Sequence, residues 1–124
     1  MPYNIHWEEN GVFCHLHGYL TISMMVQALE EHTVDPRYKN LRYRIADYTA
    51  VTDYSVLPSD MEGLATMDMA VRTLNPGILD VTVSPNPDHL ALFSHFAARA
   101  ENQSRVAFFE TLDQARAWVA AWKD

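Results

Sequence analysis

The stretch that most constrains the fold is residues 41–47, where apolar and polar side chains alternate with a period of two. Successive side chains of a β-strand project to opposite faces of the sheet. The pattern therefore predicts a central strand whose leucine, tyrosine and isoleucine contact a layer of helices. Arg42 and Arg44 are expected on the other, polar and partly open face.

The size and composition of the chain exclude several classes of protein. With 124 residues, of which 48% are hydrophobic, the chain is long enough for one core, so we expect a single domain over residues 1–124. The formal charge of -7 disfavours nucleic acid and anionic membranes as partners. Cys14 is the only cysteine, which fits a reducing compartment. No apolar run approaches the roughly 20 residues of a membrane-spanning helix, so we expect a cytoplasmic protein without membrane insertion.

Two alternating stretches at the N-terminal end predict a β-hairpin. Residues 3–8 and 12–18 each alternate apolar and polar side chains, and the Asn-Gly dipeptide at 10–11 favours a tight type I′ turn between them. If these two residues form the loop, His6 faces His15, and the apolar side chains of both strands share one face.

The rest of the chain predicts four helices and three strands in alternation. Helices are expected at 21–32, 59–74, 86–101 and 111–122, each opened by an N-cap signal (Thr21, Ser59-x-x-Glu62, Asn86-Pro87 and Thr111-x-x-Gln114), and strands at 41–47, 78–84 and 105–110. A loop is expected over 48–58. The order is that of an α/β domain, in which an N-terminal β-hairpin leads into βα repeats. Only residues 106–109 are apolar on both sides, so we expect a five-stranded mixed sheet with helices mainly on one face.

Three stretches resemble a known family. They are residues 35–38 (Asp-Pro-Arg-Tyr), the central strand ending at Asp47, and residues 105–118. The pattern covers nearly the whole chain and resembles the STAS-like domains, the family of sporulation anti-sigma-factor antagonists, especially the bacterial branch grouped with lipid-binding CRAL-TRIO-like proteins. The resemblance implies a STAS-like fold.

The resemblance also implies a role in protein interaction. Members of this family act as protein-interaction switches, some are phosphorylated on a serine beside the helix after the central strand, and a few bind nucleotides or lipids. The nearest position here is Ser55, although Tyr54 separates it from Asp53, whereas the family has aspartate directly before serine. Phosphorylation of Ser55 is one hypothesis, and an ordinary loop serine is the alternative.

The polar face of the predicted sheet is a candidate interface with a second subunit or a protein partner. Its side chains are His6, Phe13, His15, His17, Arg42 and Arg44. Aromatic residues and arginine are enriched in interfaces, and an open sheet face is commonly covered by a second copy. The arginines alternatively pair with neighbouring acids. We predict a homodimer.

The three histidines of that face, His6, His15 and His17, also carry a metal-site hypothesis. Three imidazoles from adjacent strands can bind zinc and leave a position open for water. The alternative is that they are polar residues of a wet face. We expect no metal and no cofactor.

Two further groups are candidate ligand contacts. Asp47, Asp53, Tyr54 and Ser55 follow the central strand, at the edge where open α/β sheets bind ligands. A second set lies on the two middle helices and either lines an apolar pocket or is plain core. It consists of Met61, Met67, Met69, His89, Phe93 and Phe96.

The sequence thus predicts a non-enzymatic regulatory or protein-interaction module of STAS-like type that acts as a homodimer with an unknown protein partner. With only four glycines it has no glycine-rich phosphate loop, and no Gly-x-Ser-x-Gly elbow is present. The alternatives are a protein that binds a small, lipid-like apolar ligand and, third, a metal-dependent enzyme that uses the histidine cluster.

Overall fold

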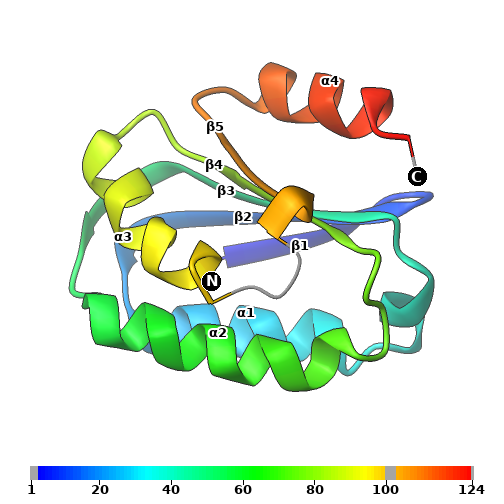
Figure 1. Ribbon diagram of the computed structural model, residues 1–124. Helices are drawn as coiled ribbons and strands as arrows, with labels where there is room; N and C mark the ends of the chain where they lie inside the picture. Colours follow the sequence, from blue (N-terminus) through cyan, green and yellow to red (C-terminus); the bar gives the residue numbers. More distant parts are fainter. Residues whose placement is uncertain (1–2, 100–102, 124) are drawn as a thin grey trace.

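The computed structural model describes residues 3–99 and 103–123, and its elements follow the predicted order (Figure 1). The strands are β1 (Tyr3–Trp7), β2 (Gly11–Leu20), β3 (Tyr43–Tyr54), β4 (Leu79–Val83) and β5 (Val106–Phe109). The helices are α1 (Ile22–Thr33), α2 (Pro58–Arg72), α3 (Pro87–Ala97) and α4 (Leu112–Ala121), with short 3-10 turns at Pro36–Asn40 and Gln103–Arg105.

The five strands form one mixed sheet in the order β1-β2-β3-β4-β5. β1 is antiparallel to β2, and the remaining neighbours are parallel. Helices α1, α2 and α3 lie on one side of the sheet and α4 on the other (Figure 1). The expected five-stranded mixed sheet with helices mainly on one face is confirmed.

The hydrophobic core is divided by the sheet. The larger cluster joins β1, β2 and β3 to α1, α2 and α3. A second cluster joins α4 to β3, β4 and β5, and Val81, Val83 and Ala115 are fully buried in it. Burying one such aliphatic side chain typically contributes about 1.5–3 kcal/mol, so both layers stabilise the sheet.

Three of the four predicted N-caps are confirmed. Thr21, Asn86 and Thr111 each accept a hydrogen bond from a backbone N–H of the following turn, at 3.2, 2.9 and 3.2 Å. In α4 the side chain of Gln114 bonds back to the Thr111 N–H, which completes the capping box. These predictions hold because a cap depends only on residues within one turn.

The predicted start of α2 is wrong. The helix begins at Pro58, and the Asp60 side chain accepts a hydrogen bond from the Leu57 N–H at 2.9 Å, so Ser59 does not cap it. Proline at the first helical position has no N–H to satisfy and is preset for helical φ, which favours the earlier start. Helix α3 also differs, because it ends at Ala97, and the expected end at residue 101 lies outside the described residues.

The predicted hairpin register is wrong by two residues. His6 pairs with Phe13 rather than with His15. In the described part of the chain the only residue with positive φ is Gly18, so the Asn-Gly dipeptide does not form a type I′ turn. Gly11 serves packing instead, because a Cβ there would lie 2.2 Å from the ring of Tyr43. A slip of two residues preserves the faces, and the apolar residues of both strands still share one side.

β3 is longer than predicted. The loop expected over 48–58 is mostly strand, because β3 continues to Tyr54 and pairs with the second half of β2, from His17 opposite Ala50 to Leu20 opposite Tyr54. The added residues are rich in β-branched and aromatic side chains, which suit a strand. Among the described residues, no helix is long and apolar enough to cross a membrane.

Candidate functional site

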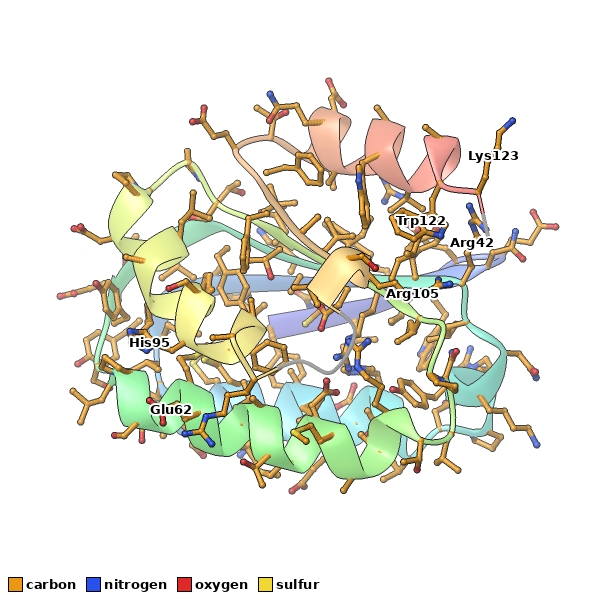
Figure 2. All side chains as sticks on the ribbon, viewed as in Figure 1. Arg42, Glu62, His95, Arg105, Trp122 and Lys123 are labelled. Atoms are coloured by element: carbon orange, nitrogen blue, oxygen red, sulfur yellow. The ribbon has the colours of Figure 1, made fainter. Side chains whose placement is uncertain are left out.

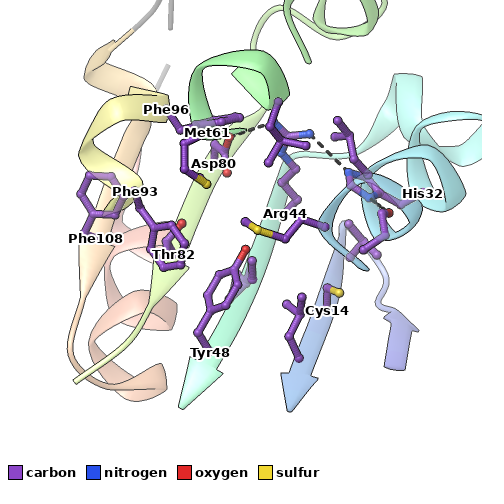
Figure 3. A pocket seen from close by; sticks show the side chains of 18 residues that line it. Cys14, His32, Arg44, Tyr48, Met61, Asp80, Thr82, Phe93, Phe96 and Phe108 are labelled. Carbon is purple, nitrogen blue, oxygen red and sulfur yellow. Dashed lines mark hydrogen bonds and ion pairs between the residues drawn. The ribbon is translucent and has the colours of Figure 1, made fainter. Parts of the chain in front are cut away.

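A partly open cavity of about 90 Å³ lies between the sheet and the helices α1, α2 and α3 (Figure 3). Its wall is mostly apolar, with a small number of polar groups. The lining residues are Val12, Cys14, Leu16, Met25, Ala28, Leu29, His32, Arg44, Ile45, Ala46, Tyr48, Met61, Leu64, Asp80, Thr82, Phe93, Phe96 and Phe108. An apolar hollow with few polar groups is typical of a small-molecule site.

One end of the cavity is closed by a buried ionic network. The Arg44 guanidinium lies 2.7 Å from Asp68 Oδ2 and 2.8 Å from Asp80 Oδ2. Arg72 adds contacts of 3.1 Å to Asp80 and 3.4 Å to Asp68. The two arginines and the two aspartates are all buried, so the network combines two positive and two negative charges away from water.

The side chains of the network stabilise one another in their ionised forms. Burial by itself would raise the pKa of Asp80, but the charges of Arg44 and Arg72 outweigh it and hold that pKa below its usual value. Burial likewise opposes the charged form of Arg44, and the two carboxylates more than compensate and raise its pKa. Asp68 Oδ1 is buried without a hydrogen-bond partner in the described part of the chain.

His32 caps this network as a neutral side chain. Its Nδ1 lies 2.7 Å from the carbonyl oxygen of Ala28 and its Nε2 lies 3.3 Å from Arg44 Nη1. The contacts assign the proton to Nδ1, which donates, while Nε2 accepts from the guanidinium. Burial, reinforced by the Arg44 charge, lowers the pKa of His32 from 6.5 to about 4.

Tyr48 supplies the polar group in the middle of the apolar wall. Its ring stacks at 4.4 Å between centroids with Phe93, and the side chain is 8% exposed. In Figure 3 the hydroxyl points toward the end of the cavity that holds Arg44. Nothing in residues 3–99 or 103–123 hydrogen-bonds to it. Burial raises the pKa of Tyr48, so the hydroxyl keeps its proton.

Half of the predicted pocket residues line this cavity. Met61, Phe93 and Phe96 do so. Met67 and Met69 do not, because they are 39% and 37% exposed on the outer side of α2, so this part of the prediction is wrong. The helical pattern alone could not separate the inner from the outer methionines, since both sides of α2 carry them.

His89 is buried next to the cavity wall rather than in it. Its Nδ1 lies 2.9 Å from Ser84 Oγ, and its ring packs edge-on against Tyr54 at 5.2 Å between centroids. It also contacts Phe93, one of the lining residues, at 6.2 Å between ring centroids. His89 therefore packs against a lining residue, Phe93, without itself lining the cavity.

The opposite face of the sheet carries a row of aromatic rings on β1 and β2, which we call the histidine face: His6, Phe13, His15 and His17. The ring centroids of successive members are 6.1, 6.4 and 5.9 Å apart. His6 is exposed and the other three are half-buried. Helix α4 packs on the same side against β3, β4 and β5 and leaves this row partly open.

The border of the histidine face is held by a compensated charge pair. Arg116 of α4 donates two hydrogen bonds to Glu8, of 2.9 and 2.7 Å, and its guanidinium lies 5.5 Å from the centroid of the Phe13 ring. The hydrogen bond from Arg116 lowers the pKa of Glu8 below its usual value. Tyr43 donates a further hydrogen bond to the same carboxylate.

The two arginines predicted on this face lie elsewhere. Arg44 points to the other side of the sheet, into the buried network, so its assignment to an open face is wrong. Arg42 donates to the carbonyl oxygens of Val119 and Trp122 at 3.2 and 2.5 Å and thereby holds the C-terminal end of α4. Figure 2 shows Arg42 and Trp122 side by side at that end, with Arg105 nearby.

The structure gives no support to a three-histidine metal site. Among the described residues, no three His, Cys, Asp or Glu side chains are placed to hold a metal ion. The hairpin register is the physical reason, because it sets His6 opposite Phe13, and the phenylalanine ring separates it from His15 and His17.

The four residues predicted at a ligand edge do not form one site. Asp47 is buried within β3, where its Oδ1 accepts a hydrogen bond from the Thr49 N–H at 2.9 Å. Asp53 and Ser55 are exposed and lie beyond it, at and just after the end of the strand, and Tyr54 between them is half-buried. The separation follows from the unexpected length of β3. Phosphorylation of Ser55 stays a prediction.

Several residues of the cavity and of its ionic network were missed from the sequence: His32, Tyr48 and Asp80 of the lining, and Asp68 and Arg72 of the network. Two signals were available. The pair at 68 and 72 has the i, i+4 spacing of a helical ion pair, and Asp80 is a charged residue within a short strand that is otherwise made of aliphatic residues and one threonine. Neither signal shows that all these charges meet at Arg44.

Comparisons with known proteins establish the fold. No family model matches the chain, and no curated protein matches it. Solved structures do match: the anti-sigma factor antagonist SpoIIAA in its unphosphorylated form has a TM-score of 0.64 and 14% identity over 97% of this chain and 99% of that one. The Bacillus cell fate determinant SpoIIAA in its phosphorylated form has a TM-score of 0.59 and 15% identity, covering 94% and 98%.

A sulfate transporter family protein from Wolinella succinogenes is also similar, with a TM-score of 0.63 and 13% identity over 91% of this chain and 87% of that one. These neighbours are STAS domains, so the predicted STAS-like fold is confirmed. At such low identity the likeness shows the fold alone. The predicted grouping with CRAL-TRIO-like proteins stays a prediction.

Proposed function

We propose that the chain is a non-enzymatic regulatory or protein-interaction module that acts as a homodimer through its histidine face. The fold supports the first part, because the similar structures include an anti-sigma factor antagonist and a sulfate transporter family protein. The observation that carries the dimer is the row of rings on β1 and β2, which α4 leaves partly open. Aromatic rings on an uncovered sheet face are typical of an interface.

The charge distribution favours a second copy at this face. The chain has a formal charge of -7 with histidines neutral, so most of its surface repels another copy. The histidine face itself carries no formal charge when its histidines are neutral, and the neighbouring Glu8 is compensated by Arg116. The charges of this face therefore do not oppose the approach of a second copy to it.

Light scattering tests the dimer. We expect a molar mass of twice 14.2 kDa at micromolar concentration for the wild type and 14.2 kDa for Phe13→Glu, because a buried carboxylate at the centre of the row is unfavourable. Leu74→Glu is the matched control, since it places the same charge at an apolar residue that is 61% exposed on the α2 side, and it should stay dimeric. A monomeric wild type would contradict the proposal.

The cavity favours a second function, the binding of a small apolar ligand. Its volume of about 90 Å³ is smaller than the ~150 Å³ of a cavity that accepts benzene, so it fits a compact molecule rather than a whole lipid chain. Native mass spectrometry of freshly purified protein should show a retained small molecule. Protein that always has the mass of the bare chain would count against a tightly held ligand.

A further inference from the structure

The cavity wall is shaped for an apolar body of limited size. Scaling from a ~150 Å³ cavity that holds the six carbons of benzene, a volume of about 90 Å³ takes roughly four non-hydrogen atoms, and a slightly longer molecule would extend into the open side. Met25 and Met61 stand among the lining residues, and flexible thioether side chains adapt to irregular apolar ligands. Size and wall chemistry thus indicate a short aliphatic or small cyclic group.

The hydroxyl of Tyr48 indicates a hydrogen-bonding group on that ligand. The side chain is buried, the hydroxyl points along the cavity, and no described residue bonds to it (Figure 3). The hydroxyl is not one of the fully buried atoms of the described residues, so it is accessible from the cavity, and a bound hydroxyl or carbonyl oxygen would take the place of water as its hydrogen-bond partner. Thr82, which also lines the cavity, offers a second hydroxyl.

The ionic network excludes a charged ligand. Arg44 and Arg72 already balance Asp68 and Asp80, and His32 is neutral with both ring nitrogens engaged. An ionised head group would be buried without a counter-charge or would have to displace a partner from the network. The cavity therefore selects an uncharged molecule.

We infer that the cavity binds a compact, uncharged organic molecule with one hydroxyl or carbonyl group, which hydrogen-bonds to the Tyr48 hydroxyl beside the Arg44 end. This inference rests on the second proposed function and names its ligand class. It is independent of the dimer, because the cavity and the histidine face lie on opposite sides of the sheet.

Titration of the full-length ¹⁵N-labelled chain with four matched probes tests the inference by NMR. The probes are butan-1-ol, 1-chlorobutane, butanoate and butylammonium, which each contain four carbon atoms in an unbranched chain and differ in the polar group at its end. We expect saturable shifts at lining residues with butan-1-ol, weaker binding of 1-chlorobutane, and binding of both charged probes that is at least about tenfold weaker than that of the alcohol.

Variants locate the binding and the hydrogen bond. Tyr48→Phe should weaken butan-1-ol about three- to tenfold and leave 1-chlorobutane unchanged, as expected for one lost hydrogen bond. Tyr43→Phe, the matched control, removes a hydroxyl on the other side of the sheet and should change neither. Ala28→Leu should fill the cavity and abolish binding of both probes, while Ala70→Leu on the exposed side of α2 should not.

The outcomes distinguish the proposed ligand class from the more general proposal that the cavity binds a small ligand. Three results would contradict the proposed ligand class but not the binding of a small ligand as such. They are equal affinity for butan-1-ol and 1-chlorobutane, unchanged binding of butan-1-ol by Tyr48→Phe, and binding of butanoate as tight as that of the alcohol. Absence of binding by all four probes would overturn both, as would binding that survives cavity filling. Ala46→Val provides a second filling variant if Ala28→Leu does not give a folded spectrum.

Discussion

On one side of β3 the side chain of Arg44 is buried between two carboxylates, and one residue further along, Ile45 packs on the other side against α4. The first side is closed by three helices and contains the cavity. The second is covered by one helix, and the histidine face remains partly open beside it. The comparison teaches that the polar side of an alternating strand need not be its wet side, because paired charges can be buried.

The largest expected effect comes from breaking the closed side. Arg44→Met leaves Asp68 and Asp80 with one buried guanidinium between them, and loss of one partner from a buried ion pair typically costs about 3–5 kcal/mol of unfolding free energy. Urea denaturation measures it.

The matched control is Arg99→Met. Arg99 pairs with Glu62 on the surface at 2.6 Å and is half exposed, and such a pair contributes at most about 1 kcal/mol. Equal losses for the two variants would show that the network is not sheltered from water.

A pH dependence follows from His32. Its pKa is about 4 in the folded chain and 6.5 as the ordinary value, so the unfolded chain takes up the proton first as the pH falls. Stability is complete above about pH 6.5 and is lost progressively down to about pH 4, by up to about 3 kcal/mol. Urea midpoints measured across this range check it.

His32→Gln should flatten that slope, and an unchanged slope would contradict the assignment. A residual slope is expected from His89, whose pKa burial also lowers. The Asp80 carboxyl contributes at lower pH, since its folded pKa lies below 3.8 and its stabilisation is lost only as the pH falls below that value.

A pair of glycine variants compares the packing of the two sides. Gly11→Ala should destabilise by about 1–3 kcal/mol, because the new Cβ would lie 2.2 Å from the Tyr43 ring on the α4 side. Gly63→Ala in α2 meets nothing within 4 Å and should stabilise by about 0.5–1 kcal/mol through helix propensity. Thermal unfolding measures both, and a neutral Gly11→Ala would show that Tyr43 can move aside.

Sequence reasoning succeeded where structure is local. The caps at Thr21 and Thr111 and the order of elements are set by residues close in the chain, and both predictions are confirmed. The alternation at 41–47 correctly predicted a strand, but β3 begins at Tyr43, and the expectation that Arg44 lies on an open face is wrong. The Asn-Gly dipeptide misled because Gly11 was read as a turn former, whereas its role is to admit the ring of a residue 32 positions away.

The candidate site could not be predicted in the same way. Arg44 and Asp80 are direct neighbours on β3 and β4, and Asp68 reaches them from α2, but none of these contacts is visible without the strand order and the packing of the helix. For this reason the side of the central strand that carries Arg44 was predicted to be exposed to solvent. The histidine row did emerge from alternation, since a register slip of two residues leaves every side chain on its face.

Isotope-filtered NMR on an equimolar mixture of ¹³C-labelled and unlabelled chains tests the contrast between the two sides most directly. The account predicts intermolecular contacts at Phe13 and His15 of the histidine face and none at the methyl groups of Met25 and Met61 in the cavity wall. Intermolecular contacts at the cavity methyls, or none at Phe13 in a sample of dimeric mass, would contradict it.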